Sequence, residues 1–221
     1  MKKLLWVMAA LFVSFAVAAQ NRDSENRIII NSAEEFLKIG STYSSSASYI
    51  QTANIDLGYR SVTSPIISGA FSGTYDGDGY SISYKATFEG SGHNHGSNNG
   101  DYALFGYVNG GTLRNMSVSG EVLLTANGAN DMNVALLCGH STNATIDHCN
   151  VAGSVSTYVN AQNGGGADAA LLIGQADNTE IKYCSGSGNV VGVGWVGGLI
   201  GSCSSGTIKA CTFSGQVEAI Q

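Results

Sequence analysis

The feature that most constrains this chain is a spaced pattern that occurs four times without a break in register. Each unit is centred on a glycine, with a leucine two positions before it and a leucine or isoleucine seven positions after it; a second glycine follows at position +14 and a valine at +16. The central glycines are Gly106, Gly139, Gly174 and Gly201, separated by 33, 35 and 27 residues. A repeat of this length, rich in glycine and β-branched residues, predicts a stacked solenoid.

The spacing within each unit predicts the kind of solenoid. Apolar residues occupy positions −2, +7, +10, +12 and +16 relative to the central glycine. Positions +10, +12 and +16 share a parity, as one face of a strand requires, whereas +7 does not. The chain must therefore turn between +7 and +10, which gives several short strands per unit. We expect an all-β parallel β-helix of about five to six coils, in which equivalent positions stack into ladders.

The N-terminus has the features of an export signal. Lys2 and Lys3 precede an apolar run over residues 4–17, and small residues lie just before Gln20. The run is short for a membrane span of about 20 residues, and no later stretch is long enough to cross a membrane. We expect residues 1–19 to be a cleaved signal peptide, and the mature chain to be secreted, periplasmic or displayed on the cell surface.

The mature chain divides into two parts. Residues 20–60 are expected to form an N-terminal strand, a capping helix and a leading coil, and residues 61–221 the repeat region. Ser32 with Glu35 forms a capping-box pattern that predicts a helix over 33–39, ended by Gly40 and covering one end of the stack. The alternating run 49–57 predicts a strand.

Charge and cysteine content limit the classes of partner. Without Lys2 and Lys3, the chain has eight basic and sixteen acidic residues, a net charge of −8 that excludes a nucleic-acid binder.

Three of the five cysteines, Cys149, Cys184 and Cys211, occupy position +10 of their units. They are expected to be buried packing thiols, with a disulfide between neighbouring coils as the alternative.

The run Gly198-Leu199-Ile200-Gly201, with variants at the other three central glycines, resembles the GLUG repeat of bacterial surface and secreted proteins. The stretch 69–82 is similar to the coils that precede such repeats, so the resemblance covers about residues 28–217. It implies a right-handed β-helix of pectin-lyase-like shape, often attached to adhesins. It supplies no catalytic residues, and the chain lacks the His-Glu-x-x-His sequence of the metallopeptidases that some GLUG proteins carry.

Three polar segments of variable length, 89–101, 126–133 and 158–168, are expected to form loops along one edge of the stack. These segments supply most of the weak candidates for ligand binding. Their histidines could coordinate a metal ion, their oxygen-bearing side chains could coordinate calcium, and the aromatic rings could stack on a sugar. The candidates are His93, His95, Asn130, Asp131, Tyr158, Asp168 and Trp195. For each, a polar loop, a turn or core packing is the alternative. No catalytic, cofactor or metal-binding residue is assigned, and calcium is the only cofactor considered.

The leading hypothesis is an exported, adhesin-like, non-enzymatic protein that binds a glycan or surface partner through the loop edge. The second is a polysaccharide lyase or glycoside hydrolase, for which Arg114 beside Asp147 is the only promising pair. Both residues also belong to a +8 ladder with Lys182 that alternates in charge along the outer wall. The third is a structural spacer or assembly module that self-associates through its C-terminal coil.

Overall fold

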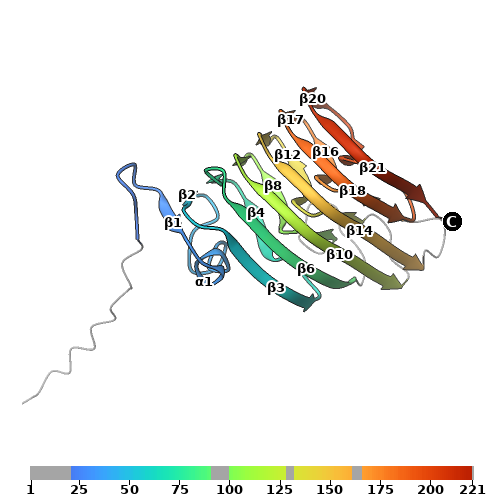
Figure 1. Ribbon diagram of the computed structural model, residues 1–221, viewed down its shortest axis with the longest axis horizontal. Coiled ribbons are helices and arrows are strands. Elements are labelled where there is room, and N and C mark those ends of the chain that lie inside the picture. Colours follow the sequence, from blue (N-terminus) through green and yellow to red (C-terminus); the bar gives the residue numbers. More distant parts are fainter. Residues whose placement is uncertain (1–20, 91–99, 128–131, 161–165, 221) are drawn as a thin grey trace, which may run out of the picture.

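A computed structural model describes residues 21–90, 100–127, 132–160 and 166–220 (Figure 1). The expected signal peptide therefore lies outside the described residues. Within them the chain is nearly all β, with one helix, α1 (Ala33–Phe36). The strands form four sheets in which every pair of neighbouring named strands is parallel, an arrangement consistent with the expected solenoid.

Each sheet is built from strands of successive units. The seven-stranded sheet is β1 (Ile28–Ile30), β2 (Ser48–Gln51), β5 (Thr74–Asp76), β9 (Thr112–Arg114), β13 (Thr145–Asp147), β17 (Thr179–Lys182) and β20 (Gly206–Lys209). The six-stranded sheet is β3 (Ile55–Val62), β6 (Ser81–Gly90), β10 (Ser117–Asn127), β14 (Asn150–Asn160), β18 (Ser185–Gly192) and β21 (Thr212–Ala219). The five-stranded sheet is β4 (Ile67–Phe71), β8 (Phe105–Asn109), β12 (Cys138–Thr142), β16 (Ile173–Asp177) and β19 (Ile200–Cys203). The three-stranded sheet is β7 (Asp101–Tyr102), β11 (Met132–Val134) and β15 (Ala167–Ala169).

The strands pair in the register that the repeat predicts. Val122 lies opposite Val155, which lies opposite Val190, and that residue lies opposite Val217. The +7 residues pair in the same way across β9, β13, β17 and β20. Figure 1 shows the six-stranded sheet running along the molecule from β3 to β21. Equivalent positions of successive units therefore stack on one another.

The predicted turn between +7 and +10 is present in every unit. It is made at +9 by a residue in the left-handed region, with φ between 50° and 53°. These residues are Asn115, His148, Tyr183 and Ala210. The turn places both the +7 and the +10 side chains inside, so that Ile146 and Cys149, for example, are both fully buried.

Close stacking explains the glycine at +14. Gly120, Gly153, Gly188 and Gly215 have φ between 140° and 153°, and a Cβ on any of them would lie 1.7–1.9 Å from a carbonyl oxygen of the preceding unit. The central glycine is crowded as well, because a Cβ on Gly201 would lie 2.6 Å from the Gly174 oxygen. Neither position has room for a side chain.

The helix α1 is shorter than expected. The Ser32 hydroxyl accepts a hydrogen bond from the Glu35 amide at 3.3 Å, as the capping pattern predicts. The Glu35 carboxylate is held instead by Lys38, at 2.9 Å, and by the Tyr43 hydroxyl. The Leu37 amide still donates to the Ala33 carbonyl, but the Lys38 and Ile39 amides donate to the carbonyls three residues back, those of Glu35 and Phe36. The α-helix therefore ends at Phe36, with Leu37 as its C-cap. The Phe36 ring packs edge-on against Tyr75 and Phe105 in the core.

The strand predicted over 49–57 was wrong in one respect, because the structure divides it. β2 ends at Gln51 and β3 begins at Ile55, so the run turns a corner from the seven-stranded to the six-stranded sheet. The fully buried Gln51 side chain stabilises the corner by donating to the carbonyls of Ala53 and Ser81.

At the other end of the described stack, the inward ladders become accessible. Ile208 is 53% exposed although its equivalent Ile181 is fully buried, and Val217 is exposed although Val190 is buried. In the part of the chain that the structure describes, no helix is both long and apolar enough to span a membrane.

Candidate binding groove

The three variable segments begin and end side by side. β6, β10 and β14 are neighbours in the six-stranded sheet, and after each of them the chain continues into β7, β11 or β15, which are neighbours in the three-stranded sheet. The ends of the segments therefore follow one edge of the stack, as expected. The candidates His93, His95, Asn130 and Asp131 lie outside the described residues.

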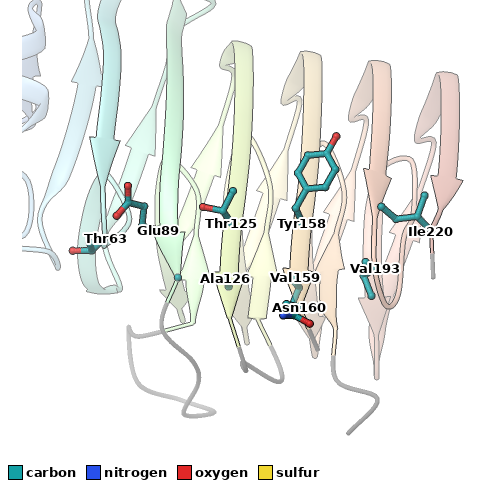
Figure 2. A pocket seen from close by; sticks show the side chains of 10 residues that line it. Thr63, Glu89, Thr125, Ala126, Tyr158, Val159, Asn160, Val193 and Ile220 are labelled. Carbon is teal, nitrogen blue, oxygen red and sulfur yellow. The ribbon is translucent and has the colours of Figure 1, made fainter. Parts of the chain in front are cut away.

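A groove of about 880 Å³ lies along the strand ends that precede these segments (Figure 2). Its lining includes a ladder at position +19, in which Thr125 lies opposite both Glu89 and Tyr158. Val193 and Ile220 occupy the same position in the next two units and also line it. The groove thus crosses several units, and its volume falls within the range of about 300–1,000 Å³ typical of small-molecule sites.

The side chains that line the groove combine one aromatic ring with neutral polar groups. Tyr158 is 56% exposed, and Figure 2 shows its ring standing away from the strand on the same side as Thr125. Thr125 and Asn160 supply hydroxyl and amide groups, and Glu89 supplies the one carboxylate among the described lining residues. Ala126 and Val159 are buried apolar residues below them. This surface can stack on a flat apolar face and hydrogen-bond to its rim.

The backbone under the groove is fixed. Thr157, fully buried next to Tyr158, accepts a hydrogen bond through Oγ1 from the Val193 amide at 3.2 Å. The Ile220 amide donates to the Gly192 carbonyl at 2.8 Å. Tyr158 itself belongs to β14 and lies opposite Thr125 of β10, while the pairing of β14 with β18 runs as far as Ser156. A site built on paired strands keeps its geometry before a ligand arrives, which lowers the entropy cost of binding.

The other two described candidates lie near the three-stranded sheet. Asp168 belongs to β15, opposite Asn133, and its carboxylate accepts a hydrogen bond from the Ser202 hydroxyl. Trp195 is 68% exposed, and its carbonyl accepts a hydrogen bond from the Ala169 amide at 2.8 Å. Only Tyr158 of the described candidates is among the residues that line the groove, although Val193, two residues before Trp195, also lines it.

The charged residues Arg114, Asp147 and Lys182 at position +8 form ion pairs with neighbouring side chains. Arg114 lies opposite Asp147 in the strand register, but its guanidinium forms an ion pair at 2.8 Å with Asp76 of the preceding unit. Burial raises the pKa of Asp76, but hydrogen bonds from the Asn115 side chain and the Asp78 amide, together with Arg114, lower it below its ordinary value overall. Asp147 contacts His148 at 2.6 Å and Lys182 at 3.9 Å. The contacts of Asp76 with Arg114, Asn115 and the Asp78 amide favour a structural role for this residue.

Sequence reasoning missed a polar network on the five-stranded sheet. His140 lies opposite Tyr107 and Gln175, with its ring 4.9 Å from that of Tyr107. Its Nε2 atom lies 2.9 Å from the Asp177 carboxylate and 3.2 Å from the Thr142 hydroxyl. The signal was available, because these side chains occupy positions +1 and +3, which are polar or aromatic in every unit.

A buried amide–carboxylate pair was also missed. Asn133 donates to Asp101 at 2.7 Å, and both residues are almost fully buried beside the central glycines. Among the described residues, no three His, Cys, Asp or Glu side chains come together in a way that could hold a metal ion.

Comparison with family models, with curated proteins and with solved structures finds no match to this chain.

Proposed function

We propose that the chain is an exported, adhesin-like, non-enzymatic protein that binds a glycan through the groove beside Tyr158. The observation that carries the proposal is the exposed Tyr158 ring in a groove bordered by Thr125, Asn160 and Glu89. The apolar face of a sugar ring fits against an aromatic side chain, and sugar hydroxyls exchange hydrogen bonds with hydroxyl, amide and carboxylate groups.

The proposal includes a finer description of the fold. We infer a right-handed parallel β-helix of about five to six coils with α1 as its N-terminal cap, built from repeats of the GLUG type. The in-register pairing of the glycine and valine ladders supports this interpretation. A bacterial origin and a location outside the cytoplasm rest on the signal-like N-terminus and on the GLUG resemblance.

The mature chain is tested first against an array of bacterial, plant and host glycans with calcium present, and the dissociation constant is then measured for each sugar class retained. Tyr158→Ala is expected to weaken binding by about ten-fold or more, or about 1.4 kcal/mol, because the stacking surface is lost. Tyr158→Phe keeps the ring and is expected to bind within a few-fold of the parent.

Tyr59→Ala is the matched control. Tyr59 is also an exposed tyrosine of the six-stranded sheet, but it lies on β3 and does not line the groove. Loss of binding in Tyr59→Ala with normal binding in Tyr158→Ala would move the site away from the groove. A blank array would contradict glycan binding itself.

Two other functions compete with this proposal. If the protein is a lyase or hydrolase, it should release products from a uronic polysaccharide in a calcium-dependent way. The ion pair between Arg114 and Asp76 leaves Arg114 poorly suited to act as the base.

An assembly module is favoured by the exposed apolar side chains of Ile208 and Val217. Sedimentation at high concentration tests it, because a monomer under those conditions would count against self-association.

A further inference from the structure

Three cysteines stack in consecutive units. The pair Asp147–Lys182 and the pair Asn150–Ser185 flank Cys149 and Cys184, which places these two cysteines opposite one another. The pairs Lys182–Lys209 and Ser185–Thr212 place Cys184 opposite Cys211 in the same way. Neighbouring strands lie about 4.8 Å apart, within the span of about 4.4–6.8 Å between Cα atoms that a disulfide bridges.

The three thiols point in the same direction. Each Sγ atom lies within hydrogen-bonding distance of the +8 carbonyl of its own unit and the +7 carbonyl of the preceding unit. For Cys184 these distances are 3.2 Å to Lys182 and 3.6 Å to Ile146. For Cys211 they are 3.4 Å to Lys209 and 3.7 Å to Ile181. The Cys211 thiol therefore leans towards the unit that holds Cys184.

Accessibility separates the members of this ladder. Cys149 and Cys184 are buried, whereas Cys211 is partly exposed. The two remaining cysteines belong to other ladders: Cys138 lies opposite Phe105 and Ile173, and Cys203 lies opposite Ala176. A reagent from solution thus reaches Cys211 before it reaches its neighbours.

We propose that Cys184 and Cys211 form a disulfide that joins the last two described units, made by exchange with a small or protein disulfide in the oxidising compartment to which the chain is exported. The bond joins two strands that are already paired, so the spacing of their backbones already suits a disulfide. It does not depend on glycan binding.

The exchange balances in two steps. The Cys211 thiolate attacks one sulfur of the external disulfide, forming a mixed disulfide and releasing one thiolate. Cys184 then loses its proton and attacks the Cys211 sulfur, which forms the internal bond and releases the second thiolate. The two cysteines lose two electrons and two protons in total, and the external disulfide is reduced to two thiols.

Accessibility sets the order of attack, and the thiol environments set the relative rates of the two steps. A hydrogen bond with Cys149 lowers the pKa of the Cys184 thiol, which favours it as the resolving nucleophile. Burial raises the pKa of the Cys211 thiol, so formation of the mixed disulfide is expected to be the slow step. Cys184 lies opposite both Cys149 and Cys211 but can form only one disulfide. A Cys149–Cys184 bond would therefore prevent the proposed one.

Trypsin distinguishes the two bonds, because the chain has cleavage sites after Arg114, Lys182 and Lys209 and none between them. Cys138 and Cys149 fall in the peptide 115–182, Cys184 in 183–209 and Cys211 in 210–221. Cys203 shares a peptide with Cys184, so the experiment uses the Cys203→Ser variant of the full chain. The purified protein is reduced, treated with oxidised glutathione, and alkylated before digestion.

The expected result is a link between peptides 183–209 and 210–221, a fall from four free thiols to two, and a mass loss of about 2 Da before alkylation. Adding Cys211→Ser should abolish the link, and Cys149→Ser should leave it intact. Four persistent thiols, or a link between 115–182 and 183–209, would overturn the assignment. Cys211 is partly exposed, so its substitution is expected to leave the fold intact.

Discussion

The ladder of glycines at +14 makes a strong prediction about Gly153→Ala. A Cβ at this position would lie 1.9 Å from the Gly120 oxygen and 2.9 Å from the Gly120 carbonyl carbon, both of them backbone atoms. The residue also has a φ of +144°, which L side chains rarely adopt. Backbone strain of about 1–3 kcal/mol and overpacking of about 1–3 kcal/mol together give a destabilisation of about 2–6 kcal/mol.

Gly110→Ala isolates the backbone contribution. Gly110 has a φ of +71°, and a Cβ there would meet no atom within 4 Å. Its substitution should cost only the left-handed penalty, about 1–2 kcal/mol. Urea unfolding followed by circular dichroism gives both free energies of unfolding. If Gly153→Ala were no more destabilising than Gly110→Ala, the claim that close stacking of the units requires glycine at +14 would be refuted.

Two further predictions concern ladder positions and pH. Ile146→Val should lower the free energy of unfolding by about 1 kcal/mol because Ile146 is fully buried, whereas Ile208→Val, at the equivalent but exposed position, should change it little; equal effects in urea unfolding would contradict the assigned inward ladder. The pKa of Asp76 is lower in the folded protein than its unfolded value of about 3.9, because the hydrogen bonds and the Arg114 ion pair outweigh the effect of burial. The ionised Asp76 therefore stabilises the fold above about pH 3.9, and this stabilisation is lost as the pH falls through the folded pKa. As the pH falls below about 4, the parent should therefore lose stability more steeply than Asp76→Asn, and parallel curves in acid titrations of unfolding would contradict this.

The regular part of the fold could be predicted because each ladder position has its own equivalents as neighbours. A valine at +16 packs under another valine at +16, so the register inferred for one unit recurs in the next, as Val155 and Val190 show. The turn before +10 followed from a change of parity alone. The end of α1 was not predicted: Lys38 and Ile39 donate to carbonyls three residues back, a change of backbone bonding that the capping pattern does not encode.

The groove was harder to predict because its residues have no common type. Position +19 is threonine, tyrosine, valine or isoleucine in successive units, so periodicity gives no signal there. Parity does give one: Val155 at +16 and Thr157 at +18 are buried, so a side chain at +19 must point outward. That argument explains why Tyr158 is exposed once the burial of Val155 and Thr157 is known. It does not place Val193 and Ile220 beside it, because that proximity depends on where each strand ends. The repeat therefore specifies the stack, and its departures from regularity, at the strand ends, shape the candidate site.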